Sequence, residues 1–128
     1  RMEWQSSRSS MTFLICASKL FIALMGAHAL CDYALQPEWM AKKKSPERES
    51  GFNEKCGPWW WIMGAHSAIN GLGVGWVTHS YLFGILETLL HFATDTNKCL
   101  GTLSTEADQF IHVTSKLAWA ACVAATIS

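Results

Sequence analysis

Four long apolar runs, separated by polar segments, dominate the pattern of the chain. They cover residues 11–35, 59–78, 81–99 and 107–127. Each is close to the ~20 residues that a helix needs to cross a bilayer. The sections 20–25 and 117–123 contain no polar residue, whereas a helix of a soluble bundle keeps a polar outer face. The pattern therefore predicts an all-α fold, an integral membrane bundle of about four transmembrane helices in a single domain, residues 1–128.

The first run has an alternative interpretation as a signal peptide, because Ala27-His28-Ala29 resembles a cleavage site; we interpret it as the first span. The second run opens with Trp59-Trp60-Trp61, which is typical of an interfacial aromatic belt. Further along this run, Gly71 and Gly75 form a small-x3-small pair, which allows close helix approach in lipid.

The polar connections differ in length and charge, and this difference orients the bundle. Residues 37–58 form a long basic connection with five Lys or Arg, 79–80 a tight turn and 101–106 a second turn. Basic connections stay on the cytoplasmic side, so the first and third connections are expected there and both termini opposite. The run Lys42-Lys43-Lys44 is interpreted as a solvated anchor, in preference to an attractor of anionic headgroups. The expected location is the inner, cytoplasmic membrane.

Composition supports a membrane protein and excludes other classes. Half of the residues are apolar, 16% are charged and seven are Trp, whereas soluble domains carry about a quarter charged residues. Ten basic and ten acidic residues balance, so no nucleic acid partner is expected. The five cysteines form no Cys-x-x-Cys pair, which excludes a thiolate zinc knuckle and gives no disulfide framework. The lipid bilayer is the expected partner, with other membrane subunits or a homo-oligomer as further candidates.

Ionisable residues recur inside all four runs, at spacings of four. The sets are His28 and Asp32; His66 followed by Asn70; Glu87, His91 and Asp95; and Asp108 and His112. A spacing of four places side chains on one helix face. Because the helices alternate in direction, every set falls near the same membrane face. Each charge inside a span costs about 2.5–3.5 kcal/mol on insertion scales, so this convergence predicts a functional site.

Histidine nitrogens combined with carboxylate oxygens suit zinc, manganese or iron, and helical bundles build dinuclear sites in this way. The sequence predicts one or two divalent metal ions. The candidate ligands are His28, Asp32, His66, His91, Asp95, Asp108 and His112. Glu87, one turn deeper, is the candidate general base. A purely structural polar cluster and a haem site are the alternatives, and the neighbouring carboxylates count against haem.

Several of these residues also carry a resemblance. Residues 28–36, His-Ala-Leu-Cys-Asp-Tyr-Ala-Leu-Gln, followed by Trp-Met-Ala-Lys at 39–42, resemble the opening motif of a small polytopic membrane family of bacteria and phages, catalogued as a domain of unknown function. Its later motifs are similar to His66-Ser67, Leu90-His91-Phe92 with Asp95 and Lys98, and Asp108-Gln109 with His112. The layout is loosely similar to that of small membrane-bound metal-dependent hydrolases, which implies such an activity by analogy alone. The long basic first connection departs from the family pattern.

The favoured function is a membrane-embedded metal-dependent hydrolase that acts on a phosphoester or lipid-linked substrate at the cytoplasmic face. A bound metal would lower the pKa of a water to about 7 and supply hydroxide. The alternative is a non-catalytic membrane subunit of a larger assembly, with a structural His/carboxylate cluster. Metal transport is disfavoured, because the outer half of the runs is nearly all apolar. The sequence assigns no role to Lys19 or Lys116.

Overall fold

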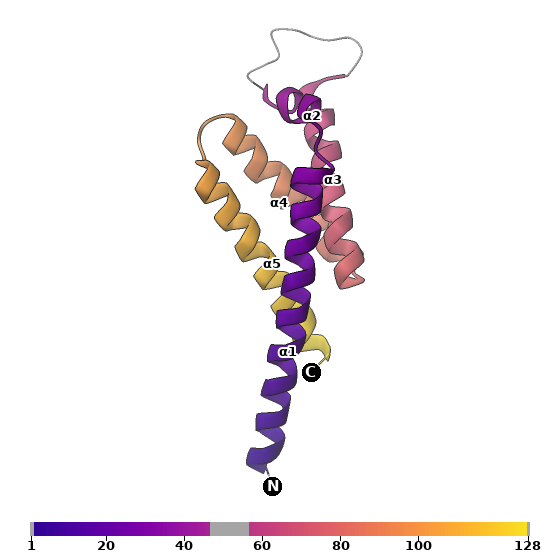
Figure 1. Cartoon of the computed structure of the whole chain (residues 1–128), viewed down its shortest axis with the longest axis vertical. Coiled ribbons are helices and arrows are strands. Elements are labelled where there is room, and N and C mark those ends of the chain that lie inside the picture. The colour runs from indigo at the N-terminus through magenta and orange to yellow at the C-terminus, as the bar shows by residue number, and fades with distance from the viewer. Residues whose placement is uncertain (1, 47–56, 128) are drawn as a thin grey trace.

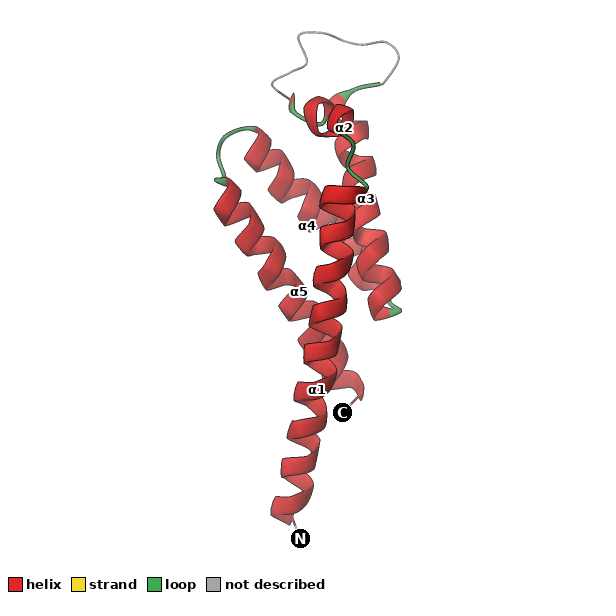
Figure 2. Ribbon diagram, in the orientation of Figure 1, coloured by secondary structure: helices red, strands yellow, loops and turns green. Residues whose placement is uncertain are grey.

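The computed structural model describes residues 2–46 and 57–127, and all regular structure within these ranges is helical (Figure 2). The elements are α1 (Met2–Ala29), the π-helical η1 (Leu30–Ala34), α2 (Glu38–Lys43), α3 (Trp59–Thr78), α4 (Tyr81–Cys99) and α5 (Thr105–Ile127). The all-α prediction is confirmed for this part of the chain. Arg48, Lys55 and Cys56 of the basic connection lie outside the described residues.

The long helix α1 runs along the whole bundle, and α5 packs against it (Figure 1). Helices α3 and α4 form an antiparallel pair, and α1 also contacts α3. The short helix α2 lies at the upper end in this view, beside the start of α3, while both chain termini lie at the lower end. The first and third connections are therefore at the end of the bundle opposite the termini, as alternating helices require.

Local signals explain most helix limits. The helices α3 and α4 have the predicted bounds, because His79 takes the left-handed conformation (φ 52°) and the Ser80 hydroxyl caps α4 by accepting from the Phe83 N–H. Helix α5 begins at Thr105, two residues before the predicted start, because the Ser104 hydroxyl accepts from the Ala107 N–H. Two features were not expected: α1 begins at Met2 and so includes the polar lead, and the short helix α2 lies within the long basic connection.

Two helical segments, Ser9–Ala34 and Thr105–Ile127, are long and apolar enough to cross a membrane. Helices α3 and α4 have 20 and 19 residues. The polar residues of the predicted site make α3 and α4 less apolar, and α4 contains three charged residues, Glu87, Asp95 and Lys98. Two of the four predicted spans, the first and the fourth, therefore meet these criteria of length and composition.

The interior is more polar than the surface. Among the described buried residues, fourteen are polar or charged and eight are hydrophobic. Large apolar side chains lie outside instead: Ile22, Leu72, Trp76 and Phe110 are each more than 70% exposed. Soluble proteins bury apolar side chains and rarely bury unpaired charged ones. This inverted distribution is the one expected where hydrocarbon, rather than water, surrounds the helices.

Helices α3 and α4 approach each other closely at glycines. A Cβ atom on Gly71 would lie 1.9 Å from the Thr88 hydroxyl oxygen and 2.5 Å from the Gly84 carbonyl oxygen. A Cβ atom on Gly75 would lie 3.6 Å from the Gly84 Cα, an ordinary contact. The close approach expected from the small-x3-small pair is thus between α3 and α4, and it depends on Gly71.

Candidate metal centre

The eight residues predicted from the sequence lie together in one cluster inside the bundle. Groups of three have ligand atoms within 4.8 Å of one another, and His91 belongs to three of the four groups. Seven of the eight are buried, and the side chain of Asp32 is 11% exposed. The members are His28, Asp32, His66, Glu87, His91, Asp95, Asp108 and His112. They come from the end of α1 with η1, and from α3, α4 and α5.

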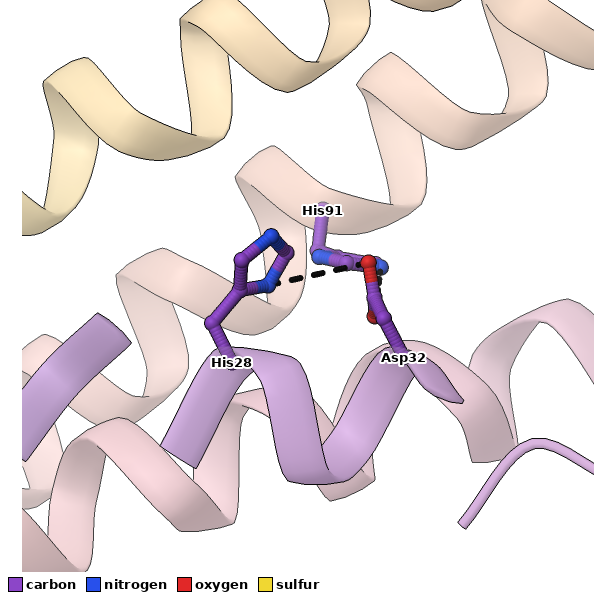
Figure 3. A group of neighbouring side chains, drawn as sticks. All are labelled: His28, Asp32 and His91. Carbon is purple, nitrogen blue, oxygen red and sulfur yellow. Dashed lines mark ion pairs between the residues drawn. The ribbon is translucent and has the colours of Figure 1, made fainter. Parts of the chain in front are cut away.

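The end of the first helix widens into a π-helix at the site. The Leu35 backbone N–H donates to the Leu30 carbonyl at 2.9 Å, and the Gln36 side-chain amide donates to the Asp32 backbone carbonyl at 3.0 Å. Short π-helical turns are rare and frequent at functional sites. His28 Nδ1 lies 3.6 Å from Asp32 Oδ2 (Figure 3), so the pair expected from the spacing of four forms despite the wider turn.

Four ligand atoms form the centre of the cluster: Asp32 Oδ1, His66 Nε2, His91 Nε2 and Asp95 Oδ2. The two nitrogens are 3.0 Å apart. Asp32 Oδ1 lies 3.5 Å from each nitrogen. Asp95 Oδ2 lies 3.3 Å from His66 Nε2 and 3.8 Å from His91 Nε2. Neighbouring ligands of a tetrahedral zinc ion, each ~2.0–2.1 Å from the metal, are roughly 3.3 Å apart. The spacing of these atoms therefore fits a zinc-sized ion.

Asn70 links the histidines to Asp32. Its Nδ2 donates to Asp32 Oδ1 at 2.8 Å and lies 3.3 Å from His91 Nε2. Its Oδ1 lies 3.4 Å from His28 Nδ1. Because both atoms near His28 Nδ1 are acceptors, this nitrogen carries the proton and Nε2 keeps a free lone pair. The sequence placed Asn70 beside the site, and the structure makes it the hydrogen-bonding link.

Each of the four clustered imidazoles has one buried ring nitrogen without a hydrogen-bond partner among the described residues. These atoms are His28 Nε2, His66 Nδ1, His91 Nδ1 and His112 Nδ1. Buried polar atoms in folded proteins are nearly always hydrogen-bonded, and exceptions point to a role or to a bound ion. On His66 and His91 the orphaned atom is Nδ1, whereas Nε2 faces the centre, so only His28 Nε2 and His112 Nδ1 are candidates for an additional ligand contact.

Three lysines neutralise the carboxylates of the cluster. Asp95 accepts from Lys44 and from Lys98, the latter at 2.6 Å. Lys98 also donates to Asp108 at 2.7 Å, and Lys116 pairs with Glu87. The interpretation of Lys44 as a solvated anchor is wrong, because α2 packs on α3 and turns this side chain inward.

Lys116, unassigned from the sequence, is completely buried. Its position four residues after His112 is the signal that could have placed it on the site face. By contrast, Lys19 is exposed on α1. Lys42 is exposed as well and pairs with Glu38 within α2.

The charge balance favours one divalent ion over two. Four carboxylates and three lysines leave one net negative charge when the histidines are neutral, so a second divalent ion would create a large positive excess. Among the described residues, Asp32 is the one carboxylate of the cluster that no lysine contacts. The position between Asp32, His66 and His91 is thus the most suitable for a cation.

Glu87 lies on the far side of His91 from this position. Its Oε1 is 3.8 Å from His91 Nδ1 and pairs with Lys116, while its Oε2 accepts from Trp119 Nε1 at 2.8 Å. Both oxygens are already engaged, which suits a residue that orients His91. The general-base role of Glu87 stays a prediction.

The fifth histidine, His79, lies exposed in the turn between α3 and α4, away from the cluster, as its place in the second connection indicated. Comparisons with protein-family models, with curated proteins and with solved structures find no match for this chain. The resemblance to a membrane family therefore stays a prediction, and function is argued from the site.

Proposed function

We propose that this protein is a four-span membrane protein that binds one divalent transition metal at its cytoplasmic end and hydrolyses a phosphoester or lipid-linked substrate there. The observation that carries the proposal is the cluster of Asp32, His66 and His91, with ligand atoms 3.0–3.5 Å apart.

The dimensions of α3 and α4 support four spans. Helices of 20 and 19 residues measure about 28–30 Å, close to the ~30 Å of a hydrocarbon core. Their exposed residues include Leu72, Trp76, Ile85 and Leu89, while His66, His91 and Asp95 belong to the cluster. Reporter fusions after Ser80 and after Leu100 should fall on opposite sides of the membrane. The same side for both would contradict the topology.

The residues of the site suit hydrolysis. A divalent ion held by Asp32, His66 and His91 would act as a Lewis acid and supply hydroxide near neutral pH. Asn70 fixes the orientation of Asp32 through its 2.8 Å hydrogen bond. Lys98, whose side chain is 26% exposed, lies at the rim of the cluster, where its ammonium group suits a phosphate oxygen.

A specific observation favours the second candidate, a non-catalytic membrane subunit. Lys44, Lys98 and Lys116 neutralise three of the four carboxylates, so the cluster needs no metal for approximate charge balance. In that case the polar network would stabilise the bundle, and the apolar exterior would meet partner subunits.

Metal content measured by mass spectrometry on the detergent-purified protein separates the two candidates. The comparison is between wild type, His91→Ala and His79→Ala, since both variants remove one imidazole and only His91 lies in the cluster. We expect about one metal per chain in wild type and His79→Ala, and loss of metal in His91→Ala. Equal metal content in all three, or none in wild type, would refute the metal site. Phosphoester hydrolysis would then be assayed with His91→Ala as the blank.

A further inference from the structure

A lateral crevice of about 340 Å³ opens between α4 and α5. Leu90 of α4 and Phe110, Thr114 and Ala118 of α5 line it. Phe110 is 71% exposed, so the crevice opens on the outer surface of a helix that is apolar and long enough to cross a membrane. It is a shallow groove in this surface and not an enclosed cavity.

The inner wall of this crevice reaches the polar cluster. Ser115 and Trp119 belong to the lining, and both bind the same carboxylate. Trp119 Nε1 donates to Glu87 Oε2 at 2.8 Å, and the Ser115 hydroxyl donates to this oxygen at 3.5 Å. The other Glu87 oxygen lies 3.8 Å from His91 Nδ1. One buried carboxylate, Glu87, therefore lies between the wall of the crevice and the histidines.

The crevice follows α5 downward from the level of the cluster. Its upper residue, Phe110, is on the outer face of α5 at the level of the buried cluster members Asp108 and His112, and its lower end is at Ala118 and Trp119. Eight residues of helix measure about 12 Å, which approaches the ~15 Å of one leaflet's hydrocarbon. A chain that begins at the cluster and follows this crevice would therefore run from headgroup depth towards the bilayer centre.

We propose that the crevice binds the acyl chain of a membrane lipid whose polar headgroup lies at the His/carboxylate cluster. The inference rests on the proposed function and narrows its substrate to a lipid ester instead of a water-soluble phosphoester. The larger groove of about 610 Å³ beside the α3–α4 turn, like the crevice, has no cluster residue in its lining, but no residue of that lining forms a described hydrogen bond with the cluster, whereas Ser115 and Trp119 of the crevice do.

The test is photo-crosslinking in vesicles of phosphatidylglycerol that carries a diazirine in the middle of its acyl chain, followed by peptide mapping. We expect cross-links concentrated in residues 110–119. Ala118→Trp fills the crevice and should abolish them. Ala125→Trp is the matched control: it adds the same bulk to an exposed position on the same helix face, two turns beyond the crevice, and should keep them.

The proposal is overturned if Ala118→Trp leaves the labelling unchanged, or if label spreads evenly over all exposed helices. It is also overturned if this segment cross-links to a second copy of the chain in place of lipid, which would assign the crevice to a protein partner. Labelling requires no metal, so the two proposals fail separately. If the crevice is labelled but no metal is bound, the lipid site stands and the hydrolase proposal falls. If metal is bound but the crevice is not labelled, the metal site stands and the lipid site falls.

Discussion

Replacement of Lys116 by Met should destabilise the bundle strongly, because it leaves the Glu87 carboxylate buried without a cation. Both side chains are at most 1% exposed, and Lys116 is the cation that contacts Glu87 among the described residues. Removal of one partner of a buried ion pair costs about 3–5 kcal/mol. Glu87 would keep its hydrogen bond from Trp119, so we expect a loss of about 3 kcal/mol, at the lower end of that range.

The double variant Glu87→Gln/Lys116→Met should recover most of this loss. The Gln amide oxygen still accepts from Trp119, and neither charge of this pair remains, so we expect a value within about 1 kcal/mol of wild type. A coupling free energy of about 2 kcal/mol or more between the two sites is then the signature of the pair.

The free energy of unfolding can be measured by titration with sodium dodecyl sulfate in mixed micelles, followed by circular dichroism. Lys19→Met is the matched control, since Lys19 is exposed on α1, and should change the unfolding free energy by less than about 0.5 kcal/mol. If Lys116→Met and Lys19→Met have equal effects, or if Glu87→Gln restores nothing, the pair is absent and the arrangement of α4 against α5 is wrong.

Three further predictions test the fold and the site. Gly71→Ala should lower the unfolding free energy by about 1–3 kcal/mol, because the added Cβ would overlap α4. Gly64→Ala is the control, since a Cβ there meets nothing within 4 Å, and it should leave the unfolding free energy unchanged. Equal effects of the two variants in the same titration would contradict the close approach of α3 and α4. Lys44→Met should strengthen zinc binding about tenfold or more by removing a cation that contacts Asp95, while Lys42→Met should leave affinity unchanged in a competition with a chromophoric chelator. Chelation of metal initially present at about 100 times its dissociation constant should lower the unfolding free energy by about 2.7 kcal/mol, and no change would mean that the native state binds none.

Periodic features of the sequence were enough to predict the helices α3 and α4 and the histidines and carboxylates that cluster. The limits of α3 and α4 follow from local signals, namely the turn at His79-Ser80 and the apolar runs on either side. The histidines and carboxylates were identified because a spacing of four places side chains on one helix face, and helices that alternate in direction bring those faces to one level. Both arguments depend on short-range geometry, which the order of residues determines.

The partners of these residues depended on the tertiary structure. Lys44 reaches Asp95 from a connection 51 residues away in sequence, and Lys116 pairs with Glu87 across 29 residues. No periodicity relates such positions, because their distance depends on how α2 packs on α3 and how α5 crosses the bundle. Packing therefore decided which lysines are on the surface and which are buried counter-ions. It thereby also decided the preference for one metal over two. The sequence by itself determined which groups gather at one end of the bundle, and the tertiary structure determined how their charges are balanced.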